Sequence, residues 1–83
     1  MPAENQRLYE RIAQKLANGI ARGEYKVGQG LPSERELAQA FSVSRPTIRE
    51  AINALELDHL VEVRVGSGVY VTNTQPPGGK AGT

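Results

Sequence analysis

The sequence lacks the residues on which small enzymes and metal-binding domains depend. Its 83 residues include no cysteine, which excludes a disulfide framework and a cysteine-based zinc site. His59 is the only histidine, and a single histidine is a poor candidate for a catalytic base or a metal site. No nucleophile with a neighbouring base and no pair of carboxylates has the pattern of an active site. We therefore expect a domain that is not an enzyme and holds no cofactor.

Long apolar segments are also missing. No run of residues is long enough to span a membrane, and the first five residues show no signal peptide. We expect a soluble, cytoplasmic protein without a membrane partner. A chain of 83 residues allows one small domain with a modest core.

An excess of one charge sign is absent too. Ten lysines and arginines stand against nine aspartates and glutamates, which gives a net charge of +1. Between Leu31 and Tyr70, four basic residues face six acidic ones. Composition alone therefore does not indicate nucleic acid as a partner, and such a partner has to be argued from the positions of the arginines.

Two serines mark the starts of two consecutive helices. Ser33 and Glu36 have the spacing of a capping box, in which each side chain accepts a hydrogen bond from the backbone N–H of the other residue. Ser44 is the second N-cap. Pro46 fits the first turn of that helix because N–H groups in a first turn have no intrahelical partner. Since the first helix reaches Phe41, only a tight turn separates the two.

The second helix, predicted over residues 44–57, has an apolar face and a polar face. Ile48 opens an apolar stripe that continues three, four and seven residues later, as in a helix packed on a core. Arg45 and Arg49 fall on the other side. A short helix, a tight turn and a second helix whose first turn is rich in Arg and Thr are typical of a helix-turn-helix. In that motif the second helix enters the major groove of DNA.

The segment after this helix predicts a β-hairpin. Residues 61–65 and 69–71 alternate in polarity, as half-buried strands do, and they flank the turn Gly66-Ser67-Gly68. Such a hairpin after a helix-turn-helix is a wing, and its small residues allow wing segment 65–69 to lie against a DNA backbone or in a minor groove.

An amino-terminal helix completes the expected domain. Leu8, Ile12, Leu16 and Ile20 recur every four residues, and Gly23 ends the helix. Residues 25–31 are a candidate for a third short strand. The sequence thus predicts a mainly α fold with a small antiparallel β-wing (α+β), which is a winged helix-turn-helix of three helices and a two- or three-stranded sheet.

The end of the chain changes in composition. We expect the winged helix to occupy residues 1–72. Residues 73–83 contain a Pro-Pro-Gly-Gly run and have no apolar periodicity, so we expect them to form a flexible linker toward an absent effector domain.

Three segments resemble a known family. Residues 31–38, 43–51 and 66–71 look like the DNA-binding domain of GntR-type bacterial transcription regulators, and the resemblance extends from about Leu8 to Val71. It is most similar to the FadR-like branch, whose C-terminal half is an all-helical effector domain. The resemblance implies a double-stranded DNA operator as partner, a homodimer on an inverted repeat, and a small-molecule effector only in a missing C-terminal domain.

The resemblance also implies roles for individual residues. Arg35 corresponds to an arginine that contacts phosphate or a base, and Thr47 to a threonine that does the same. Arg45 and Arg49 correspond to arginines that each read a guanine, and Gly66 to a glycine at a wing tip in the minor groove. The expected DNA-binding set is completed by Ser44, Pro46, Arg64, Ser67 and Gly68.

One residue departs from the family pattern. His59 stands where the family usually has glycine, in the turn after the second helix. If that turn needs a left-handed conformation, His59 carries a mild strain.

Each functional assignment has a plainer alternative. Arg45 and Arg49 could pair with Glu56 or lie beside Asn53 on a solvated face, and Arg64 could be a strand-surface charge. Arg35 could pair with a neighbouring glutamate. We expect Glu50 to brace an arginine, because a carboxylate that faces phosphate would be repelled.

The whole domain also has an alternative function, as a winged helix whose exposed arginines meet an acidic protein. The wing and the polar recognition face favour DNA. Sparse neutralisation of phosphates by one domain predicts weak binding as a monomer and hence a need for dimers.

Overall fold

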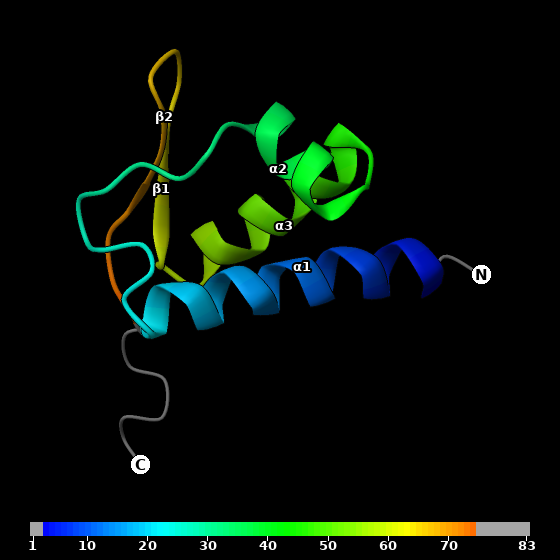
Figure 1. Cartoon of the computed structure of the whole chain (residues 1–83), viewed down its shortest axis with the longest axis horizontal. Helices are drawn as coiled ribbons and strands as arrows, with labels where there is room; N and C mark the ends of the chain where they lie inside the picture. The colour runs from blue at the N-terminus through cyan, green and yellow to red at the C-terminus, as the bar shows by residue number, and fades with distance from the viewer. Residues whose placement is uncertain (1–2, 75–83) are drawn as a thin grey trace.

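The computed structural model describes residues 3–74 and confirms the predicted order of elements. Helix α1 spans Ala3–Ala21, α2 spans Glu34–Phe41 and α3 spans Arg45–Leu57. Strands β1 (Val61–Arg64) and β2 (Gly68–Val71) pair antiparallel. In Figure 1, α1 lies along one side of α3, while α2 and the tip of the hairpin lie on the side away from α1. The domain is therefore a winged helix-turn-helix.

A single apolar core holds the three helices and the base of the hairpin together. The predicted stripes of α1 and α3 supply most of it, and α2, the turn after α3, β1 and β2 add the rest. Its buried side chains are Ile12, Leu16, Ile20, Leu37, Ala38, Ile48, Ala51, Ile52, Leu55, Leu60, Val61 and Val71. Because Ile48 and Ile52 are anchored in this core, the opposite face of α3 is turned toward solvent.

The helix-turn-helix begins with the predicted capping box. The Ser33 N–H donates to Glu36 Oε1 at 2.9 Å, and the Glu36 N–H donates to Ser33 Oγ at 3.0 Å. After α2, Ser42 adopts a left-handed conformation with φ 58°, which the sequence did not predict. The Val43 N–H then donates to the Ala38 carbonyl at 3.0 Å, so α2 ends sharply and the chain turns directly into α3.

The hairpin is shifted by one residue at its turn and is more exposed than the sequence predicts. Val61 pairs with Val71 and Arg64 with Gly68, so Gly68 belongs to a strand and residues 65–67 form the turn. The predicted strand is confirmed over 61–64, but the expectation that it is half-buried is wrong beyond Val61. Val63 is 39% exposed and Val65 is 98% exposed, because the hairpin extends beyond the helices that cover its base.

The candidate third strand is reduced to a single bridge between Gly30 and Tyr70. Two further hydrogen bonds flank it, from the Leu31 N–H to the Val69 carbonyl at 2.8 Å and from the Val71 N–H to the Gln29 carbonyl at 2.9 Å. The segment between α1 and α2 is thereby tied to the base of the wing.

The turn after α3 is left-handed, as expected, with His59 at φ 61°. The His59 carbonyl accepts hydrogen bonds from Thr72 Oγ1 at 3.1 Å and from Asn73 Nδ2 at 2.7 Å. The chain leaving β2 is thus fixed to this turn as far as Asn73. Residues 75–83, most of the predicted linker, lie outside the described residues.

Candidate nucleic-acid interface

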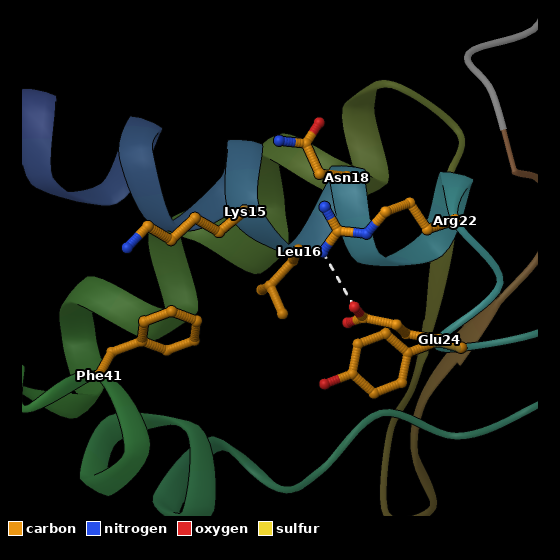
Figure 2. Close-up of a pocket in the computed structure, with 7 residues that line it drawn as sticks. Lys15, Leu16, Asn18, Arg22, Glu24 and Phe41 are labelled. Carbon is orange, nitrogen blue, oxygen red and sulfur yellow. Dashed lines mark hydrogen bonds and ion pairs between the residues drawn. The ribbon is translucent and has the colours of Figure 1, made fainter.

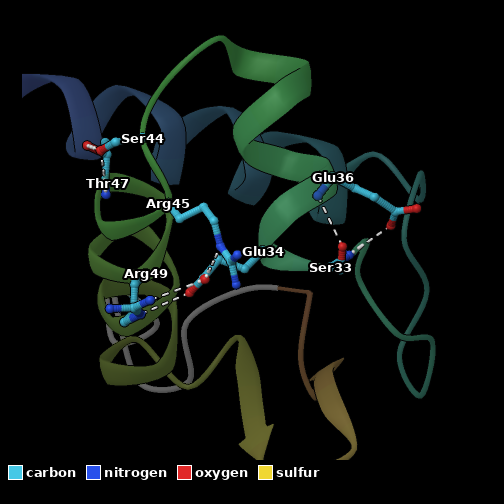
Figure 3. Close-up of polar contacts among 7 residues, drawn as sticks. All are labelled: Ser33, Glu34, Glu36, Ser44, Arg45, Thr47 and Arg49. Atoms are coloured by element: carbon cyan, nitrogen blue, oxygen red, sulfur yellow. Dashed lines mark hydrogen bonds and ion pairs between the residues drawn. The ribbon is translucent and has the colours of Figure 1, made fainter.

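The two arginines at the start of α3 share one carboxylate. Arg45 Nε donates to Glu34 Oε1 at 2.9 Å, and Arg49 Nε donates to Glu34 Oε2 at 2.9 Å. A third bond runs from Arg49 Nη2 to Glu34 Oε1 at 3.2 Å. Figure 3 shows Glu34, the first residue of α2, between the two arginines of α3. The arginine side chains remain 61% and 60% exposed, so the carboxylate links them without hiding them from solvent.

The charges in this group reinforce one another. Hydrogen bonds from Arg49 and then from Arg45 lower the pKa of the Glu34 carboxyl below its usual range. The same contact raises the pKa of Arg49, because the hydrogen bond to Glu34 favours the charged guanidinium. Glu34 is therefore ionised at neutral pH, and the group carries one net positive charge toward solvent.

The first turn of α3 is held by its cap. The Thr47 N–H donates to Ser44 Oγ at 3.4 Å, and the hydroxyl oxygens of Ser44 and Thr47 lie 2.9 Å apart. Pro46 stands exposed in the first turn, as predicted. This arrangement brings Ser44, Pro46 and Thr47 to the same end of α3 as Arg45.

The ion pairs differ from those the sequence suggested. The partner of Arg45 and Arg49 is Glu34 on another helix. Within residues 3–74, neither arginine forms an ion pair with Glu56 or a hydrogen bond with the Asn53 side chain. Glu50 is exposed and braces no arginine in that range, so that expectation is wrong. Arg35 also makes no ion pair there and is exposed on α2, apart from the Glu34 group.

A second group of candidate residues gathers on the wing. The Arg64 guanidinium carbon lies 4.6 Å from the centre of the Tyr70 ring, and Arg64 Nη2 is 3.5 Å from Glu62 Oε1. Tyr70 Oη lies 2.9 Å from Ser67 Oγ and donates to the Ser67 carbonyl at 3.2 Å. Tyr70 therefore braces both Arg64 and the turn.

The turn itself depends on Gly66 and Gly68, which have φ values of 79° and 134°. A side chain at either position would be strained. At Gly68, an added Cβ would lie 3.8 Å from the Tyr70 ring, which is an ordinary contact, so glycine is favoured there by the backbone conformation and not by lack of space. The two glycines thus let a narrow tip form above the tyrosine.

A groove separates the two groups. It has a volume of about 240 Å³ and an apolar floor, with Glu34, Arg49 and Asn53 on the helical side and Val63 and Val69 on the wing side. The start of α3 and the wing thus border one continuous surface, on the side of the molecule away from α1 (Figure 1).

Another pocket, of about 280 Å³, lies beside the end of α1. Figure 2 shows Lys15 and Arg22 around it, with Phe41 opposite and Arg22 bound to Glu24 at 2.9 Å. Its lining offers neither a histidine nor a pair of carboxylates. Within residues 3–74 no cluster of three potential metal ligands occurs, and no helix there is long and apolar enough to cross a membrane.

Two residues of the interface were missed by the sequence analysis. Glu34 is separated from Arg45 and Arg49 by 11 and 15 residues, so no local pattern indicates the contact. Tyr70 is not in the predicted DNA-binding set. Its role follows from the hairpin register, because Arg64 opposite Gly68 and Glu62 opposite Tyr70 place these residues on one face of the sheet.

The chain is similar to proteins of known family. The family model described as "Bacterial regulatory proteins, gntR family" matches residues 8–71. The Uxu operon regulator of Haemophilus influenzae is 52% identical over 68 residues, which cover 82% of this chain and 26% of that protein. The Exu regulon transcriptional regulator of Escherichia coli K12 is 48% identical over 73 residues, or 88% of this chain and 28% of that protein.

A solved structure shows the same likeness. The DNA-binding domain of AraR in complex with operator ORE1 superimposes with a TM-score of 0.77 at 35% identity, over 78% of this chain and 79% of that one. The chain spans about a quarter of the length of the curated relatives above, which are transcriptional regulators and not enzymes. With the family model covering nearly all of the described domain, the chain belongs to the gntR family of bacterial regulatory proteins.

Proposed function

We propose that this chain is the sequence-specific DNA-binding domain of a transcription regulator. Residues 44–57 would enter the major groove, and wing residues 65–69 would lie at the minor groove. One observation carries the proposal: two exposed arginines are held side by side at the start of a helix whose other face is locked in the core. The AraR domain, solved with its operator, supports it by likeness.

Arg45 and Arg49 are the base-reading residues in this proposal. A guanidinium can donate two parallel hydrogen bonds to guanine O6 and N7, and this is the commonest specific contact in the major groove. Ser44, Thr47 and Arg35 would contact phosphate and fix the register of the helix, while Pro46 shapes its first turn. On the wing, Arg64 and the tip formed by Gly66, Ser67 and Gly68 would meet the minor groove.

The assembly is part of the same proposal. We infer that two copies bind an inverted repeat as a homodimer, since two-fold docking pairs each domain with one half-site. A small-molecule effector would bind a C-terminal domain that follows residues 73–83, and DNA binding would take place in the cytoplasm. The relatives are about four times as long as the matched segment, which leaves room for such a domain.

The test begins by selecting an operator from a pool of random duplexes with the parent chain. Binding of Arg45→Ala and Arg49→Ala is then measured against that operator and its single-base variants. We expect each substitution to remove about 1–3 kcal/mol of discrimination at one base position. The matched control is Arg22→Ala, which removes the same charge just after α1. Within residues 3–74, Arg22 pairs with Glu24 alone.

Two outcomes would contradict this assignment. One is a variant at Arg45 or Arg49 that binds as tightly as the parent. The other is a loss spread evenly over all sequences, which indicates phosphate contact only. If the parent chain itself fails to prefer any sequence, sequence-specific DNA binding is contradicted, and the alternative of an acidic protein partner is the next to test.

A further inference from the structure

Glu34 leaves the outer edge of each guanidinium free. An arginine side chain has five N–H donors. Arg45 uses only its Nε–H toward Glu34, while Arg49 uses its Nε–H and one N–H of Nη2. In both residues the two terminal nitrogens still present a pair of outward donors, which is the fork that matches guanine O6 and N7. Reading a base therefore does not require either arginine to leave the carboxylate.

The carboxylate also restricts where the arginines can go. An unpaired arginine on a helix surface samples many rotamers and is attracted to any nearby phosphate. Here three hydrogen bonds fix both side chains, and the Glu34 side chain is only 27% exposed between them. A negative charge at this position repels phosphate oxygens. The contact thus disfavours binding of Arg45 and Arg49 to phosphates, and it leaves both side chains able to bind bases.

We propose that Glu34 is the positioning residue for both reading arginines, and that it keeps its hydrogen bonds in the DNA complex. This inference rests on the proposed function. Glu34 contacts no base itself. It holds the two guanidinium groups at a fixed separation, so that both guanines must be present at the right spacing. It also lowers the affinity for phosphates, which is independent of sequence, and so raises the preference for the operator.

The substitution that isolates this role is Glu34→Gln. A glutamine keeps the shape of the side chain, but it is uncharged and carries an NH2 donor in place of one accepting oxygen. It therefore cannot make all three hydrogen bonds to Arg45 and Arg49. Glu50→Gln is the matched control, because it removes the same charge from the first turns of α3 without touching either arginine.

The first measurement uses the free chain. Hydrogen exchange of the Nε–H groups of Arg45 and Arg49 is followed by NMR. We expect slow exchange in the parent and in Glu50→Gln, faster exchange in Glu34→Gln, and continued protection when the selected operator is added to the parent. Equal exchange in the parent and Glu34→Gln would overturn the linkage. Loss of protection on adding operator would overturn the claim that Glu34 stays bound.

The second measurement compares affinity for the operator with affinity for a scrambled duplex over a range of salt. In Glu34→Gln we expect the preference for the operator to fall by about fivefold to about 150-fold, the discrimination of one bidentate contact. We also expect tighter binding to the scrambled duplex. For the scrambled duplex, the slope of log affinity against log salt should become steeper by about 0.9 for each arginine that moves to a phosphate.

The outcomes separate the inference from the function on which it rests. If Arg45→Ala and Arg49→Ala lose discrimination but Glu34→Gln behaves as Glu50→Gln does, the positioning role is wrong and the proposed function stands. If the arginine variants discriminate as well as the parent, the base-reading roles in the proposed function are wrong, and the positioning role falls with them.

Discussion

At the scale of single residues, the state of Glu34 links the interface to pH. Its pKa lies below the usual value in the folded chain, because Arg49 and Arg45 donate hydrogen bonds to it, whereas in the unfolded chain these partners are lost. The unfolded chain therefore takes up this proton at a higher pH than the folded chain. The stability that the contact provides is present in full above the unfolded pKa and is lost as pH falls through the folded one.

We predict that the parent chain and Glu34→Gln differ in urea midpoint at pH 7, and that the difference shrinks as pH falls below the usual range of a glutamate. The reason is that acid protonates Glu34 in the parent and leaves a glutamine unchanged. The difference at pH 7 should be small, because the arginines of this ion pair are largely exposed. Urea titrations at pH 7 and across the acidic range measure it, and a difference that grows toward acid would contradict the prediction.

At the scale of elements, α2 and α3 end in the same way. After α3, the His59 N–H donates to the Glu56 carbonyl at 2.9 Å and the Leu60 N–H to the Leu55 carbonyl at 3.0 Å. This is a Schellman motif, and it needs a left-handed residue, which glycine usually supplies. The chain instead uses His59 and, after α2, Ser42. Both helix ends are therefore mildly strained.

We predict that His59→Gly raises the free energy of unfolding by about 0.5–1 kcal/mol. This is the left-handed strain that glycine relieves, minus the stability lost because glycine adds entropy to the unfolded chain. Its backbone contacts with Thr72 and Asn73 use the His59 carbonyl and so remain. Asp58→Gly is the control. Asp58 has φ −85°, where glycine relieves nothing, and we expect that variant to be less stable than the parent. Urea denaturation of both variants provides the measurement, and a less stable His59→Gly would show that the imidazole contributes more than its backbone strain costs.

The elements also show which features the sequence can predict. Caps and apolar stripes involve residues within one or two turns, so Ser33, Ser44 and the buried face around Ile48 could be found locally. The exposure of Val63 could not, because it depends on how far the hairpin extends past the helices. In the interface, Arg45 and Arg49 were predicted but the Glu34 contact was not. That contact depends on the packing of α2 against α3, which no local pattern in the sequence specifies.

At the scale of the whole molecule, the chain has little to hold two copies together in solution. Its large exposed apolar side chains within residues 3–74 are Val27, Leu57, Val63 and Val65. These stand on the segment before α2, the end of α3 and the wing, and they do not form one face of a helix. The net charge of +1 likewise gives one copy a weak electrostatic hold on DNA. Both facts favour association on the operator only.

We predict that the free chain is a monomer and that two copies bind an inverted repeat cooperatively. The molecule measures 34 × 31 × 22 Å and one turn of DNA is about 34 Å long. Two copies therefore fit side by side on one face when their half-sites are about one turn apart, or closer when a shorter dimension lies along the DNA. Sedimentation at micromolar concentration should show a monomer without DNA and two chains on a duplex with both half-sites. A duplex with one half-site should bind one copy more weakly. Moving the half-sites apart by about five base pairs turns the second copy to the opposite face and should abolish the cooperativity, because five base pairs are about half a turn of DNA. A stable dimer in the absence of DNA would contradict this, since it would require an apolar interface that the exposed side chains of residues 3–74 do not form.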